Sequence, residues 1–268
     1  MTRISMAAHS YDAIPGFGLL YDAVPMYAAR RDVAFYVEEA ERTGGPVLEL
    51  GCGTGRVLIP IARAGHDVTG VDESRAMLER CEAKVRGERA DVQDRITLHE
   101  HDVRDFGLGV TFPLVIAPFR VMQHLLSTDD QLRFLATVMR HLARGGRFVF
   151  DVFNPKLSAM AAFDGVERED TPETPLPDGR TVRRAARVAA VRWLEQVNDV
   201  ELVYHVAPTA GALAERHVQA FPMRWYLRDE LTHLLARSGF RIEAIHGDFD
   251  RTPLVDGAPE IVVHATPM

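Results

Sequence analysis

The segment from Val47 to Gly55 reads Val-Leu-Glu-Leu-Gly-Cys-Gly-Thr-Gly, and it limits the fold more than any other part of the chain. A short apolar run before three closely spaced glycines predicts a buried strand that ends in a tight turn, because glycine tolerates positive φ and has no Cβ. Residues 56–64 then have the apolar spacing of a helix and end at Gly65. A strand, a glycine turn and a helix in this order are typical of α/β domains that bind a nucleotide at the turn.

The same alternation continues to residue 154. Apolar runs alternate with segments of helical apolar spacing, which predicts a mostly parallel sheet with helices on both faces. Thr128 is expected to cap a helix, because Thr128 to Gln131 has the pattern of a capping box. Further strands are predicted over 67–72, 96–99, 113–117 and 147–153, and further helices over 26–43, 74–86 and 128–142.

From Asn154 onward the pattern changes. Period-2 runs with turn signals at Asp178-Gly179 and Asn198-Asp199 predict an antiparallel insertion. A helix over 227–238 and strands over 240–246 and 260–265 are expected to follow, the two strands forming a hairpin. We therefore expect a Rossmann-like, doubly wound α/β fold with a seven-stranded, mostly parallel sheet. Its predicted parts are a core with an N-terminal lid helix (1–154), an antiparallel β insertion (155–224) and a segment that completes the core sheet (225–268).

Composition narrows the classes of partner. The 268 residues include 38 acidic and 31 basic side chains, and the net charge of −7 argues against nucleic acid as a partner. The two cysteines, Cys52 and Cys81, form no C-x-x-C pair, so neither a disulfide framework nor a thiolate metal site is expected. No apolar stretch approaches the roughly 20 residues of a membrane span. We expect a cytoplasmic protein without a membrane partner; its oligomeric state is open, with a homodimer as one alternative.

Acidic residues stand at three successive strand ends. Glu49 precedes the first glycine by two residues, where it can attract a cationic amino group. Asp72 ends the second strand at about the 20-residue interval at which an acid accepts the hydroxyls of a ribose, and Asp102 after the third strand can accept from an adenine amino group. Acids that merely end strands and cap helices are the alternative for Asp72 and Asp102.

Together these motifs resemble those of class I S-adenosylmethionine-dependent methyltransferases. The matching runs are E-L-G-C-G-T-G, G-V-D-E-S at 70–74 and H-D-V at 101–103, and the resemblance covers about residues 20–155. It implies S-adenosyl-L-methionine as cofactor and S-adenosyl-L-homocysteine as product. The acid before the glycines and the glycine loop would lie along the methionine part, the second-strand acid at the ribose, and the third-strand acid with its neighbour at the adenine. The cofactor-binding candidates in these runs and the helix after them are Glu49, Gly51, Cys52, Gly53, Gly55, Asp72, Glu73, Met77, Asp102 and Val103.

The methyl acceptor is expected after the fourth strand, because ligands of open parallel sheets lie outside the carboxyl ends of the strands. Phe119, His124 and Leu125 match the F-x-x-x-x-H-L pattern of small-molecule members of the family, among them N,N-dimethyltransferases of amino sugars. In those enzymes a histidine at this place approaches the substrate. His124 is therefore the candidate catalytic base, with a structural histidine as the alternative.

Further candidates come from position in the chain. Before the first long helix, related enzymes often fold an aromatic lid and an arginine over the cofactor, although packing is the alternative for each such residue. The additional cofactor-binding candidates are Phe119, Tyr21, Tyr27 and Arg31, and the substrate-binding candidates are Arg120, Gln123, Asn154, Arg224 and Tyr226.

We predict a methyltransferase that transfers a methyl group by in-line displacement to a nitrogen or oxygen of a small molecule. A Rossmann oxidoreductase is disfavoured because the glycines are spaced G-x-G-x-G rather than G-x-G-x-x-G and because no Tyr-x-x-x-Lys pair occurs. A nucleic-acid methyltransferase would carry an N-P-P-Y type loop after the fourth strand, which is absent. A non-catalytic scaffold that binds the cofactor stays open, since fold alone does not establish activity.

Overall fold

The computed structural model describes residues 11, 14 and 16–268. By their packing these residues form two compact units. The core unit comprises residues 31–155 and 225–268. The insertion unit comprises the described residues up to Arg30 together with residues 156–224.

The core unit contains a seven-stranded sheet with the strand order β10-β11-β5-β4-β1-β2-β3. Neighbours from β3 to β5 run parallel, whereas β11 is antiparallel to both β5 and β10. The mostly parallel sheet and the terminal hairpin predicted from the sequence are therefore confirmed. The strands are β1 (Val47–Leu50), β2 (Val68–Asp72), β3 (Ile96–Glu100), β4 (Phe112–Ala117), β5 (Leu142–Phe153), β10 (Phe240–His246) and β11 (Glu260–Pro267).

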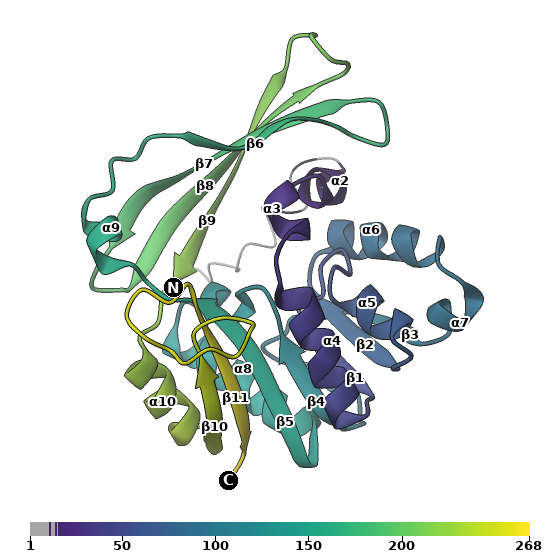
Figure 1. Ribbon diagram of the computed structural model, residues 1–268, viewed down its shortest axis with the longest axis vertical. Coiled ribbons are helices and arrows are strands. Elements are labelled where there is room, and N and C mark those ends of the chain that lie inside the picture. The colour runs from purple at the N-terminus through teal and green to yellow at the C-terminus, as the bar shows by residue number, and fades with distance from the viewer. Residues whose placement is uncertain (1–10, 12–13, 15) are drawn as a thin grey trace. The chain divides into compact units, whose positions relative to one another are not determined.

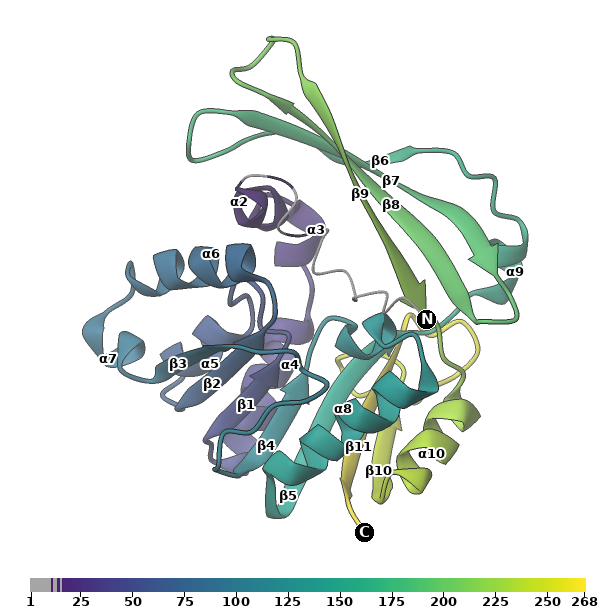
Figure 2. The same ribbon diagram turned by 180° about the vertical axis from the view of Figure 1, so that it is seen from behind.

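Helices cover both faces of this sheet. Helix α4 lies on the face seen in Figure 1, and α8 and α10 lie on the face seen in Figure 2. On the first face, buried apolar side chains of α4, α5 and the central strands, such as Tyr36, Leu58 and Val68, form one hydrophobic cluster. The helices are α4 (Asp32–Thr43), α5 (Leu58–Arg63), α6 (Arg75–Val85), α7 (Ala90–Gln93), the 3₁₀ helix η1 (Val121–His124), α8 (Thr128–His141) and α10 (Arg228–Arg237).

Two predicted helix boundaries were wrong. The helix expected over 26–43 is divided into α3 (Pro25–Ala28) and α4. Helix α4 begins at Asp32, whose carboxylate is favourable at a helix N-terminus. The cap of α8 is Ser127 rather than Thr128, because Ser127 is extended and its Oγ accepts a hydrogen bond from the Asp130 N–H at 3.1 Å.

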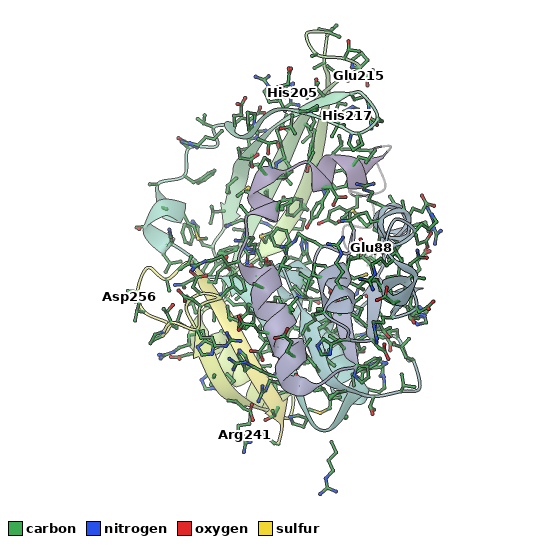
Figure 3. The ribbon with its side chains drawn as sticks, turned by 45° about the vertical axis from the view of Figure 1, so that its right-hand side comes forward. Glu88, His205, Glu215, His217, Arg241 and Asp256 are labelled. Atoms are coloured by element: carbon green, nitrogen blue, oxygen red, sulfur yellow. The ribbon has the colours of Figure 1, made fainter. Side chains whose placement is uncertain are left out.

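The insertion unit contains a four-stranded antiparallel sheet in the order β6-β7-β8-β9. The turn expected at Asn198-Asp199 was misplaced: these residues lie in β8, and the chain turns just before them, where Gln196 takes a positive φ of 56°. Figure 3 shows His205, Glu215 and His217 near the hairpin that joins β8 to β9. The elements of this unit are α2 (Phe17–Asp22), α3, α9 (Leu157–Ala161), β6 (Arg168–Pro175), β7 (Thr181–Arg192), β8 (Val197–Ala207) and β9 (Glu215–Arg224).

No helix in the described part of the chain is both long and apolar enough to cross a membrane. Within the same residues, no group of three or more His, Cys, Asp or Glu side chains is placed to hold a metal ion.

Candidate functional site

The turn between β1 and α5 depends on glycine at positions 51, 53 and 55. Gly51, Gly53 and Gly55 have φ values of 69°, 53° and 78°, which side chains rarely adopt. A Cβ on Gly51 would lie 2.5 Å from Val121 Cγ2, and one on Gly55 would lie 2.6 Å from Cys81 Sγ. The N–H groups of Gly51 and Cys52 donate to the carbonyl of Val71 in β2 at 2.7 and 3.1 Å. The turn is thus fixed against β2, with Gly51 and Gly53 partly exposed and Gly55 buried.

Glu49 places a buried carboxylate at the end of β1. Its side chain is 2% exposed, and its Oε2 has no hydrogen-bond partner among the described residues. Burial raises the pKa of Glu49 well above the ordinary value; the charge of Arg56 opposes this effect, and Asp32 and Asp72 add to it. A buried acceptor without a donor is costly unless a ligand supplies one. A cationic amino group would both donate to Oε2 and stabilise the charge.

Asp72 joins the glycine turn to the start of α6. Its Oδ2 accepts a hydrogen bond from the Gly53 N–H at 2.8 Å, and its Oδ1 accepts one from the Ser74 N–H at 2.9 Å. These two bonds fix the plane of the carboxylate, while each oxygen can accept more than one hydrogen bond. Met77 contacts the same turn, because its Cε would lie 3.4 Å from a Cβ on Gly53. The structure therefore brings Asp72, Met77 and the glycine turn together at this edge of the sheet.

Asp102 is bound by Arg104, a partner that was not predicted from the sequence. The Nε of Arg104 donates to both carboxylate oxygens of Asp102, at 2.8 and 2.9 Å, and its Nη1 donates to Asp130 at 3.2 Å. Burial alone would raise the pKa of Asp102, but the hydrogen bonds and charge of Arg104 outweigh it and lower the pKa. An adenine amino group would have to share these oxygens with Arg104. The adjacent Val103 is buried and offers an apolar surface.

The turn after β4 has a strained backbone. Phe119 and Arg120 are consecutive non-glycine residues with positive φ, 57° and 74°. Such conformations persist where the surroundings enforce them, often at functional sites. Here the Phe119 N–H donates to the fully buried Asp151 at 2.8 Å. The Arg120 guanidinium lies 3.4 Å from Glu260 and 5.3 Å from the ring centroid of Phe153.

Three predicted substrate residues form hydrogen bonds with the backbone, and two of them, Gln123 and Tyr226, fix η1. The Oε1 of Gln123 accepts a hydrogen bond from the Phe153 N–H at 3.0 Å, and the Tyr226 hydroxyl donates to the Met122 carbonyl at 3.0 Å. Asn154 donates through Nδ2 to the Ala258 carbonyl at 2.9 Å. These contacts give Gln123, Asn154 and Tyr226 a structural role.

His124 ends η1 and is partly buried. Desolvation lowers its pKa to about 4, so the imidazole is neutral near pH 7. A base with so low a pKa accepts a proton weakly, which limits the help it can give to a hydroxyl nucleophile.

Five further candidates are distributed over the two units. Arg31, in the core unit, pairs with Asp248 at 2.5 Å. Tyr21, Tyr27 and Arg224 belong to the insertion unit. There the rings of Tyr21 and Tyr27 are 4.8 Å apart, the buried Arg184 donates to the Tyr27 hydroxyl at 2.6 Å, and Arg224 donates to the Glu195 carbonyl at 2.8 Å. Glu73, in the core unit, is partly buried beside Asp72.

A buried network beside the glycine turn was not predicted from the sequence. Arg56 donates two hydrogen bonds to Asp32, at 2.7 and 2.6 Å, and its guanidinium lies 4.8 Å from the ring centroid of Phe119. Asp151, which holds the Phe119 N–H, also accepts a hydrogen bond from Tyr36 at 2.7 Å. The only signal in the sequence was the position of Arg56 directly after the third glycine.

Comparisons with known proteins show that this site lies in a segment similar to methyltransferases. Residues 47–146 match the model of a methyltransferase domain. A dTDP-3-amino-3,4,6-trideoxy-alpha-D-glucopyranose N,N-dimethyltransferase from Streptomyces venezuelae is 26% identical over 235 residues, which cover 87% of this chain and 91% of that protein. The putative methyltransferase YqeM from Bacillus subtilis is 29% identical over 51% of this chain and 54% of that protein.

Solved structures share the fold along nearly the whole chain. The CcbJ methyltransferase from Streptomyces caelestis superimposes with a TM-score of 0.76 at 22% identity, and 98% of each chain is covered. A sugar N-methyltransferase from a Streptoalloteichus species superimposes with a TM-score of 0.67 at 25% identity, covering 92% of this chain and 91% of that one. The matched domain contains the glycine turn, Glu49, Asp72 and Asp102, so these residues lie in the part of the chain that is similar to methyltransferases.

Proposed function

We propose that this protein transfers the methyl group of S-adenosyl-L-methionine to an amine nitrogen of a small molecule. The observation that carries the proposal is the buried Glu49 carboxylate with an unpartnered oxygen beside the glycine turn. That oxygen suits the ammonium of an amino-acid moiety, and a dinucleotide has no corresponding group. A relative named as an N,N-dimethyltransferase and another named as the Cypemycin N-terminal methyltransferase support nitrogen as the acceptor atom.

The proposed cofactor contacts follow the order of the strands. Glu49 would bind the amino group, and Gly51, Gly53 and Gly55 would lie along the methionine part. Asp72 would accept the ribose hydroxyls, and Asp102 with Val103 would frame the adenine. When bound, the cofactor supplies a methyl group on a cationic sulfur that a nucleophile displaces in line.

The residues around the acceptor would act mainly by positioning. Well-oriented intramolecular reactions reach effective molarities of about 10⁵ to 10⁸ M, so holding the amine in line with the methyl group accounts for most of the expected acceleration. The low pKa of His124 favours nitrogen over oxygen, because a neutral amine is already nucleophilic whereas a hydroxyl needs a stronger base. We propose His124 and Arg120 as residues that line the acceptor side of the strained turn.

A direct test measures cofactor binding and methyl transfer separately. Calorimetry with S-adenosyl-L-homocysteine is expected to show binding that Glu49→Gln weakens by tenfold or more, since the charge-assisted hydrogen bond contributes about 1.5 to 3 kcal/mol. Isotope-labelled S-adenosylmethionine, incubated with a metabolite extract and a panel of amino sugars and peptide amines, should then yield a labelled N-methyl product by mass spectrometry. Absence of binding would refute the function, whereas binding without any labelled product would favour the scaffold alternative.

We also propose a cytoplasmic location, and a homodimer is one alternative for the oligomeric state. Both cysteines are buried and neither is joined in a disulfide, in keeping with a reducing compartment. Light scattering on the purified protein would measure its mass in solution, and a monomeric mass at micromolar concentration would rule out a stable dimer.

A further inference from the structure

A closed ring of contacts surrounds the carboxyl ends of the central strands. It runs from Asp32 at the start of α4 to Arg56 after the glycine turn, then to Phe119 after β4, to Asp151 in β5, and back to α4 through Tyr36. Asp32, Asp151 and Tyr36 are fully buried. Arg56 is the one cation in this ring.

Arg56 bears on two parts of the proposed cofactor site. Its guanidinium lies over the ring of Phe119, whose backbone is held at φ 57°, and a cation over an aromatic face is attractive. Its charge also opposes the effect of burial on Glu49, whereas the charges of Asp32 and Asp72 reinforce that effect. The bidentate contact with Asp32 fixes the guanidinium plane for both purposes.

We infer that Arg56 is a positioning residue that orders the amino-acid end of the cofactor by acting on Glu49 and on Phe119 at once. This inference rests on the proposed function. Arg56 touches neither the transferred methyl nor the acceptor in this role. Its effect reaches the cofactor through the charge of Glu49 and the pose of the Phe119 ring.

The charge component predicts a pH-dependent defect. An opposite charge nearby lowers the pKa of a carboxyl group by about one to three pH units. Without Arg56, Glu49 would remain protonated to a higher pH, and the ammonium of the cofactor would lose its ionic partner. The dissociation constant of Arg56→Met should therefore exceed that of the wild type about tenfold or more at pH 6, and the ratio should narrow toward pH 8.5.

Asp32→Asn should change the pH profile in the opposite direction. The Asp32 carboxylate raises the pKa of Glu49, so its removal favours the charged form of Glu49 and moves the pH midpoint of binding downward. Arg56→Lys keeps the charge but loses the bidentate contact and the planar stacking. It should keep the wild-type pH midpoint and lower turnover through the pose of Phe119.

The experiment is calorimetry with S-adenosyl-L-homocysteine between pH 6 and 8.5. At each pH the dissociation constant of a variant is divided by that of the wild type, because this ratio removes the effect of titration of the ligand. Arg63→Met is the matched control, because Arg63 lies nearby in sequence, at the end of α5, but pairs with Glu88 at the surface. Its ratio should stay near one at every pH.

The outcomes separate this inference from the proposed function. A wild-type protein that binds no S-adenosyl-L-homocysteine at any pH would overturn both. Two results, with binding by the wild type intact, would overturn the inference alone. One is a loss of affinity in Arg56→Met that is equal at every pH. The other is a pH midpoint of binding that moves in the same direction in Arg56→Met and in Asp32→Asn. If Arg56→Met does not fold, the direction of the shift in Asp32→Asn still decides the question.

Discussion

Replacing Asp72 with alanine tests whether the carboxylate at the end of β2 both holds the glycine turn and binds the cofactor. The substitution removes the acceptors of the Gly53 and Ser74 N–H groups, which lie at 2.8 and 2.9 Å. A hydrogen bond to a charged group contributes about 1.5 to 3 kcal/mol, but water can partly replace a half-buried acceptor. We therefore expect the free energy of unfolding to fall by about 1 to 3 kcal/mol in total.

The effect on the cofactor should be larger. Two ribose hydroxyls lose a charged acceptor, which corresponds to about 2 to 4 kcal/mol of binding free energy and to a dissociation constant raised roughly 30- to 1000-fold. Asp72→Asn should fall between wild type and alanine, because its amide keeps one acceptor and turns an NH₂ group toward a backbone donor.

The assays are urea unfolding of the free protein and calorimetry with S-adenosyl-L-homocysteine. Asp67→Ala is the matched control: Asp67 lies just before β2, and its pair with Arg95 is a surface ion pair worth about 0 to 1 kcal/mol. The reasoning is refuted if Asp72→Ala unfolds at the same urea concentration and binds with the same affinity as Asp67→Ala.

Three further predictions follow from single residues. Gly55→Ala should lower the free energy of unfolding by about 2 to 4 kcal/mol, because the new methyl group clashes with Cys81 and alanine disfavours the positive φ. The control is Gly109→Ala, because Gly109 has a φ of 71° and no atom lies within 4 Å of a Cβ built on it, so this variant should show the conformational cost alone. Equal urea midpoints for the two variants would contradict the clash with Cys81. Glu49→Gln should raise the free energy of unfolding of the free protein at pH 7.5, because the raised pKa of Glu49 means that its ionisation destabilises the fold. This increase should become smaller toward pH 4.5. An increase that does not depend on pH would argue against a buried charge. The wild-type protein should lose stability as the pH falls from about 6.5 to 4, because the depressed pKa of His124 makes its protonation unfavourable in the folded state. His124→Gln should lose less stability over the same range. Identical curves of unfolding free energy against pH for the two proteins would exclude this effect.

Local chemistry explains why the sheet could be predicted. Parallel strands that are buried on both faces appear as continuous apolar runs, and β1 and β4 are of this kind. A turn with positive φ can be predicted from its glycines, because few other residues tolerate that conformation. The terminal hairpin followed from two apolar runs separated by Asp256-Gly257 and Pro259.

The turn predicted at Asn198-Asp199 and the cap predicted at Thr128 were wrong because the local sequence is compatible with more than one structure. Asn198-Asp199 is a strong turn signal, yet Asn198 is buried in β8, and its pairing with Met223 overrides the local preference. The cap of α8 differed by a single residue, because Ser127 and Thr128 are both good caps and only the backbone conformation distinguishes them.

The sequence alone determined the order of the strands along the chain, the glycine turn, and the acids at three strand ends, because each depends on residues close together in sequence. Tertiary structure decided which of those acids have partners: Oε2 of Glu49 has none in the described residues, Asp72 is bound by backbone amides, and Asp102 is bound by Arg104. It alone brought Arg56 to Asp32 and Tyr36 to Asp151. The physical reason is that charge pairing and burial depend on distance in space, which one-dimensional spacing does not contain.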